Sequence, residues 1–540
     1  MLQARQFRQA LLWPLRLMQS QGRREPPWHW LRALGPASPW REVVDEYTGA
    51  ATDFHERHYR EFVAFLPYVQ RFLYGEGRTR RGTGDGGSPM RVFRRNDIAR
   101  VRTVAQPGDA PLTLDIVHVD LYFFYDVDLV LLNVEVSATD LTLREAQEVM
   151  YRFGRGYPGG WDEEGCPLHC MASVEWLAAD GSVLHASDSG ESELFLKHVS
   201  EHRAPRISGH WAYLLQPLVP DYSTEEGVLR YRQIEYYRMP LMVFLALDRP
   251  RELTRADFTC LGLVTAAPRS DDASLPYSEA HLDDFERRYC FDRFWCAGGE
   301  APNTRYLCSG HSLVVVGDAA SPFFVDRDRG VLAQFRHQHF LMFLIAHFQK
   351  AALLMFSDGL AQALMALSVD DPESVRRFKR SIRQAFEGFL RFTHRYWFHE
   401  ISEQAHVRAL WHMCSQHLDI DPLYAEVKER IAEMSSYLEA DSLRRQANTV
   451  VRLTVVTIFG LIGTVATGFL GMNLISEAEA PFLAKLFYFL IVFVPTIALT
   501  FYTIAKSKRL SDFLDALSDE RLPVKYKLAA LMAVWRRGRE

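Results

Sequence analysis

The spacing of apolar residues changes from strand-like to helical along the chain. Between 112 and 136, β-branched and aromatic residues fill two stretches, 112–125 and 129–136, around the polar turn Asp126-Val-Asp128. This pattern predicts a β-hairpin. Further strands are predicted at 172–177, 183–186, 211–218, 234–247, 261–266 and 313–317, with a helix at 278–289. Strands and helices mixed in this way indicate an α+β domain over residues 90–325, which we expect to be cytosolic.

Aspartates gather around this hairpin, at positions 115, 120, 126, 128 and 140. Asp126 and Asp128 fall at the turn, where aspartate forms local hydrogen bonds, so the pattern favours turn chemistry over an ion site. Asp140 precedes the periodic segment 141–150 and is expected to be the N-cap of a helix there.

Beyond Asp328 the pattern becomes helical. Apolar residues run from 331 to 367, but polar side chains that include His337, His339, His347 and Asp358 interrupt them. No uninterrupted stretch reaches the roughly 18 residues of a bilayer span. We therefore expect a core helix that is buried on most sides, and we favour packing over metal binding for its histidines.

Two Asp-Pro steps divide the rest of this helical region, 326–452. Asp371-Pro372 supplies an N-cap and a proline at the first helical position. Mostly aromatic residues then recur at helical spacing from Phe378 to Leu410, which predicts one arm of an antiparallel pair that closes at Asp421-Pro422. No proline follows up to Leu470, so about 48 residues of helix, about 72 Å long, are expected to include a stalk.

Two uncharged stretches near the C-terminus are long enough to cross a bilayer. The first, 453–470, corresponds to about 27 Å of helix, and the second, 486–505, is slightly longer. Basic residues flank the outer ends of the pair, which predicts that both termini are cytoplasmic. We expect the following segments: a first transmembrane helix at 453–473, an extracytoplasmic loop at 474–485, a second transmembrane helix at 486–505 and a basic cytoplasmic tail at 506–540.

The two predicted spans differ in polarity. The second is aromatic and aliphatic throughout, which suits lipid, whereas the first carries several threonines and glycines. A stripe at 3–4 spacing on the first span is formed by Leu453, Thr457, Leu461, Thr464, Gly468 and Gly471. Small and hydroxyl residues in such a stripe favour either one wall of a channel or a helix–helix contact face.

The triplet Gly471-Met472-Asn473 ends the first span and precedes the short loop. In this position it resembles the signature of the CorA family of magnesium and other divalent-cation channels. The resemblance implies a homopentamer in the inner (plasma) membrane, with the first transmembrane helices around the pore, Mg²⁺ as the transported ion and no cofactor. Five Asn473 amides would then form a ring at the outer mouth, where neutral dipoles bind the hydrated ion without stripping its waters.

Other roles follow from the same resemblance. Leu453 and Leu461 would be hydrophobic constrictions, Thr464 an inner polar ring, and Glu477 and Glu479 in the loop would concentrate cations. The chain departs from the family at Leu470, where an aromatic residue is usual, and at Leu474-Ile475. Ion identity therefore stays open, with a channel or exporter for Zn²⁺, Co²⁺ or Ni²⁺, or a membrane-anchored sensor or binding protein, as alternatives.

The first 89 residues predict a basic, partly helical leader with a Gly/Arg-rich loop at 75–89. Within it, residues 1–20 interleave arginine with apolar residues, which predicts either an amphipathic segment on the membrane surface or a partly disordered leader. The tail from 510 to 540 predicts a basic amphipathic helix on the inner leaflet or a simple basic anchor.

Composition and motifs narrow the classes of function that remain. A net charge of -5 gives no electrostatic case for a nucleic-acid partner. Seven cysteines without a CxxC pair indicate reduced thiols, and Cys166-Pro-Leu-His169-Cys170 is better explained as a loop than as a zinc site. No nucleophile elbow or HExxH motif occurs, so we do not expect an enzyme.

Overall fold

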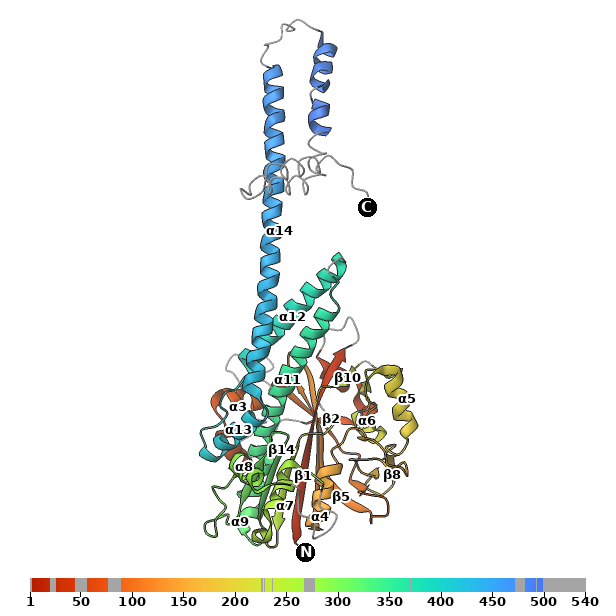
Figure 1. Cartoon of the computed structure of the whole chain (residues 1–540), viewed down its shortest axis with the longest axis vertical. Helices are drawn as coiled ribbons and strands as arrows, with labels where there is room; N and C mark the ends of the chain where they lie inside the picture. The colour runs from red at the N-terminus through yellow and green to blue at the C-terminus, as the bar shows by residue number, and fades with distance from the viewer. Residues whose placement is uncertain are drawn as a thin grey trace. The chain divides into compact units, whose positions relative to one another are not determined.

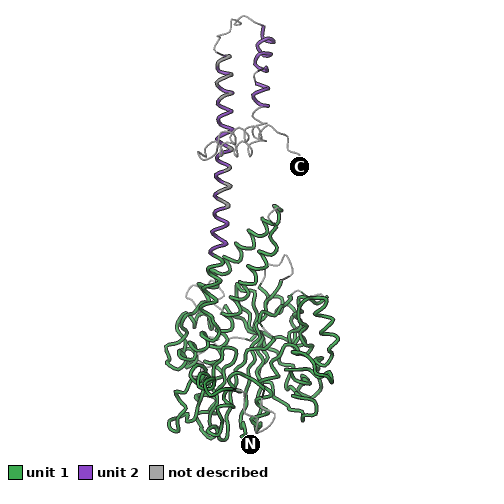
Figure 2. Tube along the Cα trace, viewed as in Figure 1, with its two compact units in different colours: residues 1–431 green, residues 432–540 purple. Residues whose placement is uncertain are grey.

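The computed structural model describes most of the chain, in two compact units. The described residues are 2–19, 26–43, 56–75, 89–224, 227, 229–235, 237–266, 277–368, 371–471, 481–491 and 493–498. The first unit comprises residues 1–431 and the second residues 432–540 (Figure 2). Several predicted features lie outside the described residues: most of the 75–89 loop, most of the 474–485 loop and the tail 506–540.

The first unit is built on one mixed sheet, to which fourteen strands of the described residues belong. Its main path is β12-β13-β14-β11-β1-β6-β5-β4-β7-β8, with β2, β3, β9 and β10 attached beside it. Most neighbours are antiparallel, whereas β11 pairs with β14, and β9 with β10, in parallel. The strands are β1 (Gln3–Gln19), β2 (Trp40–Glu42), β3 (Met90–Arg95), β4 (Arg100–Val104), β5 (Leu112–Phe124), β6 (Val127–Thr142), β7 (Ser173–Leu177), β8 (Val183–Ala186), β9 (Val219–Pro220), β10 (Leu229–Gln233), β11 (Leu241–Leu247), β12 (Cys290–Phe291), β13 (Arg305–Cys308) and β14 (Ser312–Asp318).

Helices surround this sheet and continue beyond it (Figure 1). They are α1 (Pro27–Leu34), η1 (Gly35–Ala37), α2 (Glu56–Val63), α3 (Pro67–Tyr74), α4 (Leu143–Arg152), α5 (Ser192–His202), α6 (Gly209–Leu215), η2 (Pro250–Glu252), α7 (Arg255–Leu263), α8 (Glu279–Tyr289), α9 (Pro322–Val325), α10 (Val331–Gln334), η3 (Phe335–His339), α11 (Phe340–Met365), α12 (Pro372–Tyr396), α13 (Ala405–His417) and α14 (Ile420–Gly471). A mixed sheet with many helices agrees with the expected α+β architecture.

The expected N-terminal leader is wrong for residues 3–19, which form the central strand β1. Strand β1 pairs with β6 along almost its whole length and with β11 on its other side. Its arginines, which suggested a surface segment, are each neutralised by an acid that is distant in sequence. These ion pairs are Arg5–Asp140 at 2.9 Å, Arg8–Glu135 at 2.7 Å and Arg16–Asp358 at 2.7 Å.

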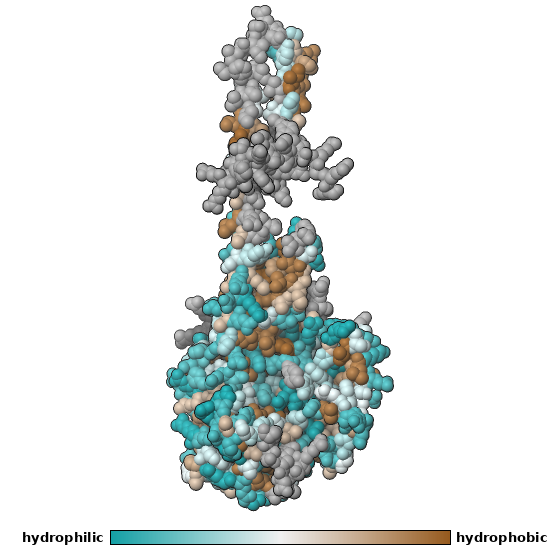
Figure 3. All heavy atoms as spheres, viewed as in Figure 1, coloured by the Kyte–Doolittle hydropathy of each residue, from teal (hydrophilic) through white to brown (hydrophobic). Residues whose placement is uncertain are grey.

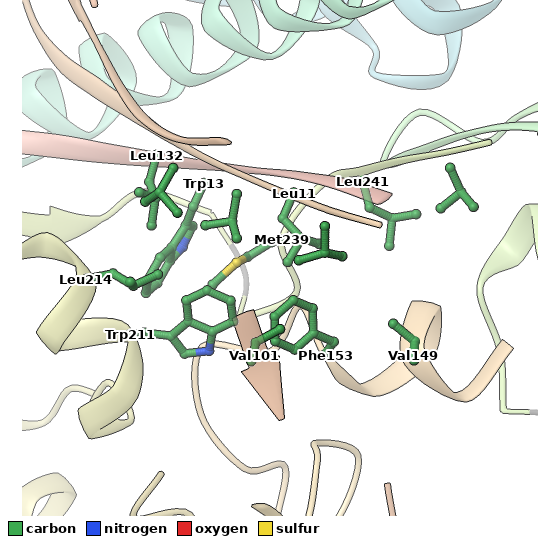
Figure 4. Packing of buried hydrophobic residues seen from close by; sticks show 14 of the residues in the cluster. Leu11, Trp13, Val101, Leu132, Val149, Phe153, Trp211, Leu214, Met239 and Leu241 are labelled. Atoms are coloured by element: carbon green, nitrogen blue, oxygen red, sulfur yellow. The ribbon is translucent and has the colours of Figure 1, made fainter. Parts of the chain in front are cut away.

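A large core covers one face of the sheet. Leu11 and Trp13 of β1 point into it, where Trp13 and Trp211 meet edge to face with ring centroids 6.2 Å apart (Figure 4). Trp211 belongs to α6, so the strand predicted at 211–218 is wrong, and the strand predicted at 261–266 overlaps the end of helix α7. Short apolar runs do not distinguish a buried helix from a strand, which explains both errors.

The hairpin β5–β6 is confirmed, and its turn contains Asp126, whose φ of 63° is left-handed. The predicted cap of the next helix is wrong. Thr142, not Asp140, caps α4 in a capping box with Glu145, because β6 continues past Asp140. Asp140 adopts a left-handed φ of 56° and pairs with Arg5 instead.

The segment 331–365 is a buried helix of the first unit, as expected. It comprises α10, the π-helical turn η3 and α11. Among the described residues, this is the helix that is long and apolar enough to cross a membrane by length and composition, and 67% of its apolar window is buried. That burial is typical of a core helix. In the two predicted spans, the described residues give shorter apolar helices, 449–461 and 482–498, so both spans remain predictions.

The single helix predicted between Asp371 and Asp421 is in fact two helices, α12 and α13. Asp371 caps α12 as expected, by accepting a hydrogen bond from the Glu373 amide at 2.9 Å. The helix stops at Tyr396, and α13 begins at Ala405. Between them the Ile401 carbonyl accepts a hydrogen bond from the Leu66 amide at 2.9 Å, so a tertiary contact replaces helix here. The last helix, α14, is continuous to Gly471, as predicted.

Candidate functional site

The predicted first span is the C-terminal part of α14, and in the second unit it lies beside the helical segment 482–498 (Figure 1). Contact between them is close at Gly463. A Cβ atom placed on Gly463 would lie 2.5 Å from the Cγ2 atom of Thr496, so a side chain here would force one of the two helices or Thr496 to shift. Val455, about 80° from Gly463 around the helix, is only 3% exposed. At Gly463, α14 therefore packs on the segment 482–498.

The predicted stripe lies away from this contact on α14. At about 100° per residue its six members span about 80° of the helix circumference, and Val455 and Gly463 lie about 160° and about 120° from the middle of that span. All six members are exposed, with Leu453 at 66% and Leu461 at 64%. The helical pair of one chain thus covers one face of α14 and leaves the stripe uncovered.

The threonines of α14 use their hydroxyl protons within the helix. Thr457 donates to the Leu453 carbonyl at 2.8 Å, and Thr464 donates to the Gly460 carbonyl at 2.9 Å. A hydroxyl that donates in this way still has lone pairs that accept. Thr457 and Thr464 can therefore each offer an oxygen acceptor without an unsatisfied donor.

The glycines of the stripe have no close neighbour in one chain. A Cβ atom on Gly468 or Gly471 would meet nothing within 4 Å, and the same holds for Gly460. Of the four glycines expected to allow close approach, Gly463 alone does so toward the segment 482–498. The sequence pattern did not distinguish it from the other three.

Part of the predicted site lies outside the described residues. Gly471 is the last described residue of α14, whereas Met472, Asn473, Glu477 and Glu479 are not described. The structure therefore places the stripe of α14 but not the Asn473 position that the triplet resemblance proposes as a site for a hydrated ion.

The segment 482–498 exposes large apolar side chains over its surface (Figure 3). The most exposed are Phe482, Leu483, Phe487, Ile491 and Val494. A soluble protein surface rarely presents so many neighbouring apolar side chains, which mark a contact with a partner or with lipid.

The first unit contains a groove of about 910 Å³ between α11 and α12. Small residues line its walls, among them Gly359, Ala363, Ala385 and Gly388. Two of the arginines that line it, Arg16 and Arg391, form ion pairs with Asp358 and Asp126, respectively. Three arginines and three acidic residues line the groove, so their formal charges balance.

The candidate metal ligands of the first unit do not form a cluster among the described residues. His347 Nε2 lies 3.2 Å from the Gly310 carbonyl, and burial lowers the pKa of His339 to about 3. His169 Nδ1 lies 2.5 Å from the Tyr151 hydroxyl, and burial raises the pKa of Cys170 to about 11. Among the described residues, no group of three histidine, cysteine, aspartate or glutamate side chains is arranged to hold a metal ion.

Three aspartates of the hairpin, Asp120, Asp126 and Asp140, form separate ion pairs rather than one cluster. An Asp120 oxygen lies 2.8 Å from Arg94 Nε. An Asp126 oxygen lies 2.7 Å from a guanidinium nitrogen of Arg395 on α12. Burial raises the pKa of Asp128, which lies in β6 just beyond the turn.

No protein-family model, curated protein or solved structure matches this chain. An interpretation of its function therefore depends on the triplet, the two apolar segments and the surface of α14.

Proposed function

We propose that this chain is the subunit of a homo-oligomeric channel that moves Mg²⁺, or a related divalent cation, across the inner membrane. The observation that carries this proposal is the exposed stripe of α14, which lies away from the contact between Gly463 and the segment 482–498. In sequence, this stripe ends at the triplet Gly471-Met472-Asn473.

Oligomerisation follows from the exposure of the stripe. One pair of helices cannot enclose an ion path, and uncovered glycines and threonines in a bilayer favour contact between helices. Copies arranged around an axis with their stripes inward would cover this face, while the aromatic segment 482–498 would face lipid. The resemblance to the CorA family supports five copies.

The stripe has the chemistry of a path for a hydrated cation. Thr457 and Thr464 offer hydroxyl oxygens, whereas Leu453 and Leu461 narrow the path with apolar side chains that gate by dewetting. No carboxylate interrupts the stripe, so a divalent ion would not be held too tightly to leave. Asn473 at the outer mouth would hold the hydrated ion through amide dipoles, and Glu477 and Glu479 would raise the local cation concentration.

The test is magnesium uptake by cells that lack their own transporter. Wild type should restore uptake, and Asn473→Ala should remove most of it, because the amide ring at the mouth is lost. Asn448→Ala is the matched control, since Asn448 lies on α14 outside the stripe and should leave uptake unchanged. Equal uptake by all three forms, at equal membrane levels, would contradict the role of Asn473.

The alternatives have separate readouts. Competition by Zn²⁺, Co²⁺ or Ni²⁺ in the same flux assay would identify another preferred ion. A confirmed oligomer in liposomes that conducts no divalent ion would replace the channel with a membrane-anchored binding protein.

A further inference from the structure

Helix α12 carries a concentration of positive charge that contrasts with the chain as a whole. The chain has a net charge of -5, whereas α12 has seven arginines and lysines against two glutamates. The basic residues are Arg376, Arg377, Lys379, Arg380, Arg383, Arg391 and Arg395. This helix forms a hairpin with α11, and the hairpin extends beyond the sheet of the first unit (Figure 1).

The charges of the first half of α12 lie on its outer face. At about 100° per residue, Arg376, Arg380 and Arg383 fall within about 60° of one another. All three are exposed, while Phe378 and Ile382 on the opposite side are buried against the rest of the unit. The basic face is therefore open to a partner.

Contacts within the chain neutralise the two halves of α12 differently. In the second half, Arg395 lies 2.7 Å from Asp126 of the β5–β6 turn. In the first half, the contacts are longer and exposed: Arg376 lies 3.6 Å from Glu373, and Arg377 lies 3.7 Å from Asp371. Exposed pairs of this kind contribute little free energy.

Arg380 and Arg383 form no ion pair with any residue that the structure describes. Their charges remain available to an external anion.

Large apolar side chains accompany this basic face. Leu390 continues it along α12 and Phe386 lies at its edge, and both are more than one-third exposed, while the exposed acid Glu387 lies on the same face. At the end of α11, next to the start of α12, Leu364 is exposed and Met365 is 79% exposed. Cations interleaved with exposed phenylalanine and leucine are typical of helices that lie in the interface of an anionic bilayer.

We propose that the α11–α12 hairpin docks on the anionic phospholipid headgroups of a bilayer. Arg376, Arg380 and Arg383 contact phosphate oxygens, and Phe386 and Leu390 enter the interface beside them. A nucleic-acid backbone would use the arginines but not the apolar side chains, so the combined surface favours lipid. This inference depends on the proposed membrane location, but not on ion conduction.

The test is hydrogen–deuterium exchange of the full chain in lipid nanodiscs. Discs of phosphatidylcholine alone are compared with discs of equal parts phosphatidylcholine and phosphatidylglycerol. In the anionic discs, α12 peptides should exchange several-fold more slowly, and high salt should reverse the effect because it screens the charges. Peptides of the buried strand β14 should exchange equally in both discs.

Paired variants make the test specific. Arg380→Gln/Arg383→Gln should lose the lipid dependence of α12. Arg287→Gln/Arg288→Gln, which neutralises two exposed arginines on α8, should retain it. The proposal is overturned if wild-type α12 exchanges equally in both discs, if the α12 variant keeps the full effect, or if added RNA but not phosphatidylglycerol protects α12.

Failure of this inference is distinguishable from failure of the proposed function. Release of the chain from native membranes by alkaline carbonate, without detergent, would contradict the transmembrane spans. For a chain released in this way, the same exchange experiment is performed with vesicles of the two compositions. Equal exchange in a chain that needs detergent and still conducts would contradict the hairpin contact alone.

Discussion

Among the four glycines of α14, Gly463 is where the backbone needs the absence of a side chain. Gly463→Ala would place a methyl group 2.5 Å from Thr496 Cγ2, whereas Gly460→Ala meets nothing within 4 Å. We expect Gly463→Ala to lower the melting temperature of the detergent-solubilised protein. Gly460→Ala should leave it unchanged or raise stability by about 0.5–1 kcal/mol, because alanine favours helix.

A second substitution tests the contact itself. Thr496→Ala removes the methyl group that opposes Gly463 and should restore part of the stability lost in Gly463→Ala. Equal melting temperatures for Gly460→Ala and Gly463→Ala would show that the two helices do not pack through this face.

His339 makes the first unit sensitive to acid. Burial lowers its pKa to about 3, because both ring nitrogens lie in the core without a partner among the described residues. The unfolded chain binds a proton near pH 6.5, so the contribution of His339 is present above that pH and is lost as the pH falls toward 3. The expected slope is about 1.4 kcal/mol per pH unit.

His339→Phe should remove that share of the pH dependence. The measurement is the free energy of unfolding of the full chain in detergent at several pH values between 6 and 4. The exposed residue His281 on α8 provides the control, and His281→Phe should keep the wild-type slope. An unchanged slope in His339→Phe would contradict a buried neutral imidazole.

At the scale of elements, β1 depends on its arginine pairs to different degrees. Arg8 and Glu135 are buried together, whereas Arg5 and Asp140 are both more than half exposed. Arg8→Met should cost about 3–5 kcal/mol, because Glu135 would be left as an unpaired buried charge. Arg5→Met should cost less than about 1 kcal/mol. Chemical unfolding measures both, and equal costs would contradict the burial of β1 at the centre of the sheet.

An element could be predicted from the sequence when the contacts that stabilise it are local, but not when they come from distant parts of the chain. The β5–β6 hairpin and the cap at Asp371 were predictable because a turn and an N-cap are local signals. Strand β1 was not, because the acids that neutralise its arginines come from β6 and α11, far along the chain. The break between α12 and α13 was missed for the same reason, since the Leu66 amide that contacts Ile401 is remote.

At the scale of the whole molecule, the candidate site was only partly predictable. The 3–4 spacing identified the stripe from Leu453 to Gly471, because helical periodicity is visible in the sequence. The spacing could not indicate which face of α14 packs on the segment 482–498, because that depends on tertiary packing such as the contact between Gly463 and Thr496. The mouth at Asn473 remains a prediction from the triplet alone.

The most direct test of the account is blockage of ion flux by a thiol reagent at single introduced cysteines. In proteoliposomes, Mg²⁺ flux through Leu461→Cys should fall after treatment with a charged thiol reagent, because Leu461 faces the proposed path. Ile458→Cys is the matched control, since Ile458 is also exposed on α14 but lies outside the stripe. Its flux, like that of wild type with its native cysteines, should not change. Equal effects of the reagent on Leu461→Cys and Ile458→Cys would contradict a pore lined by this face of α14.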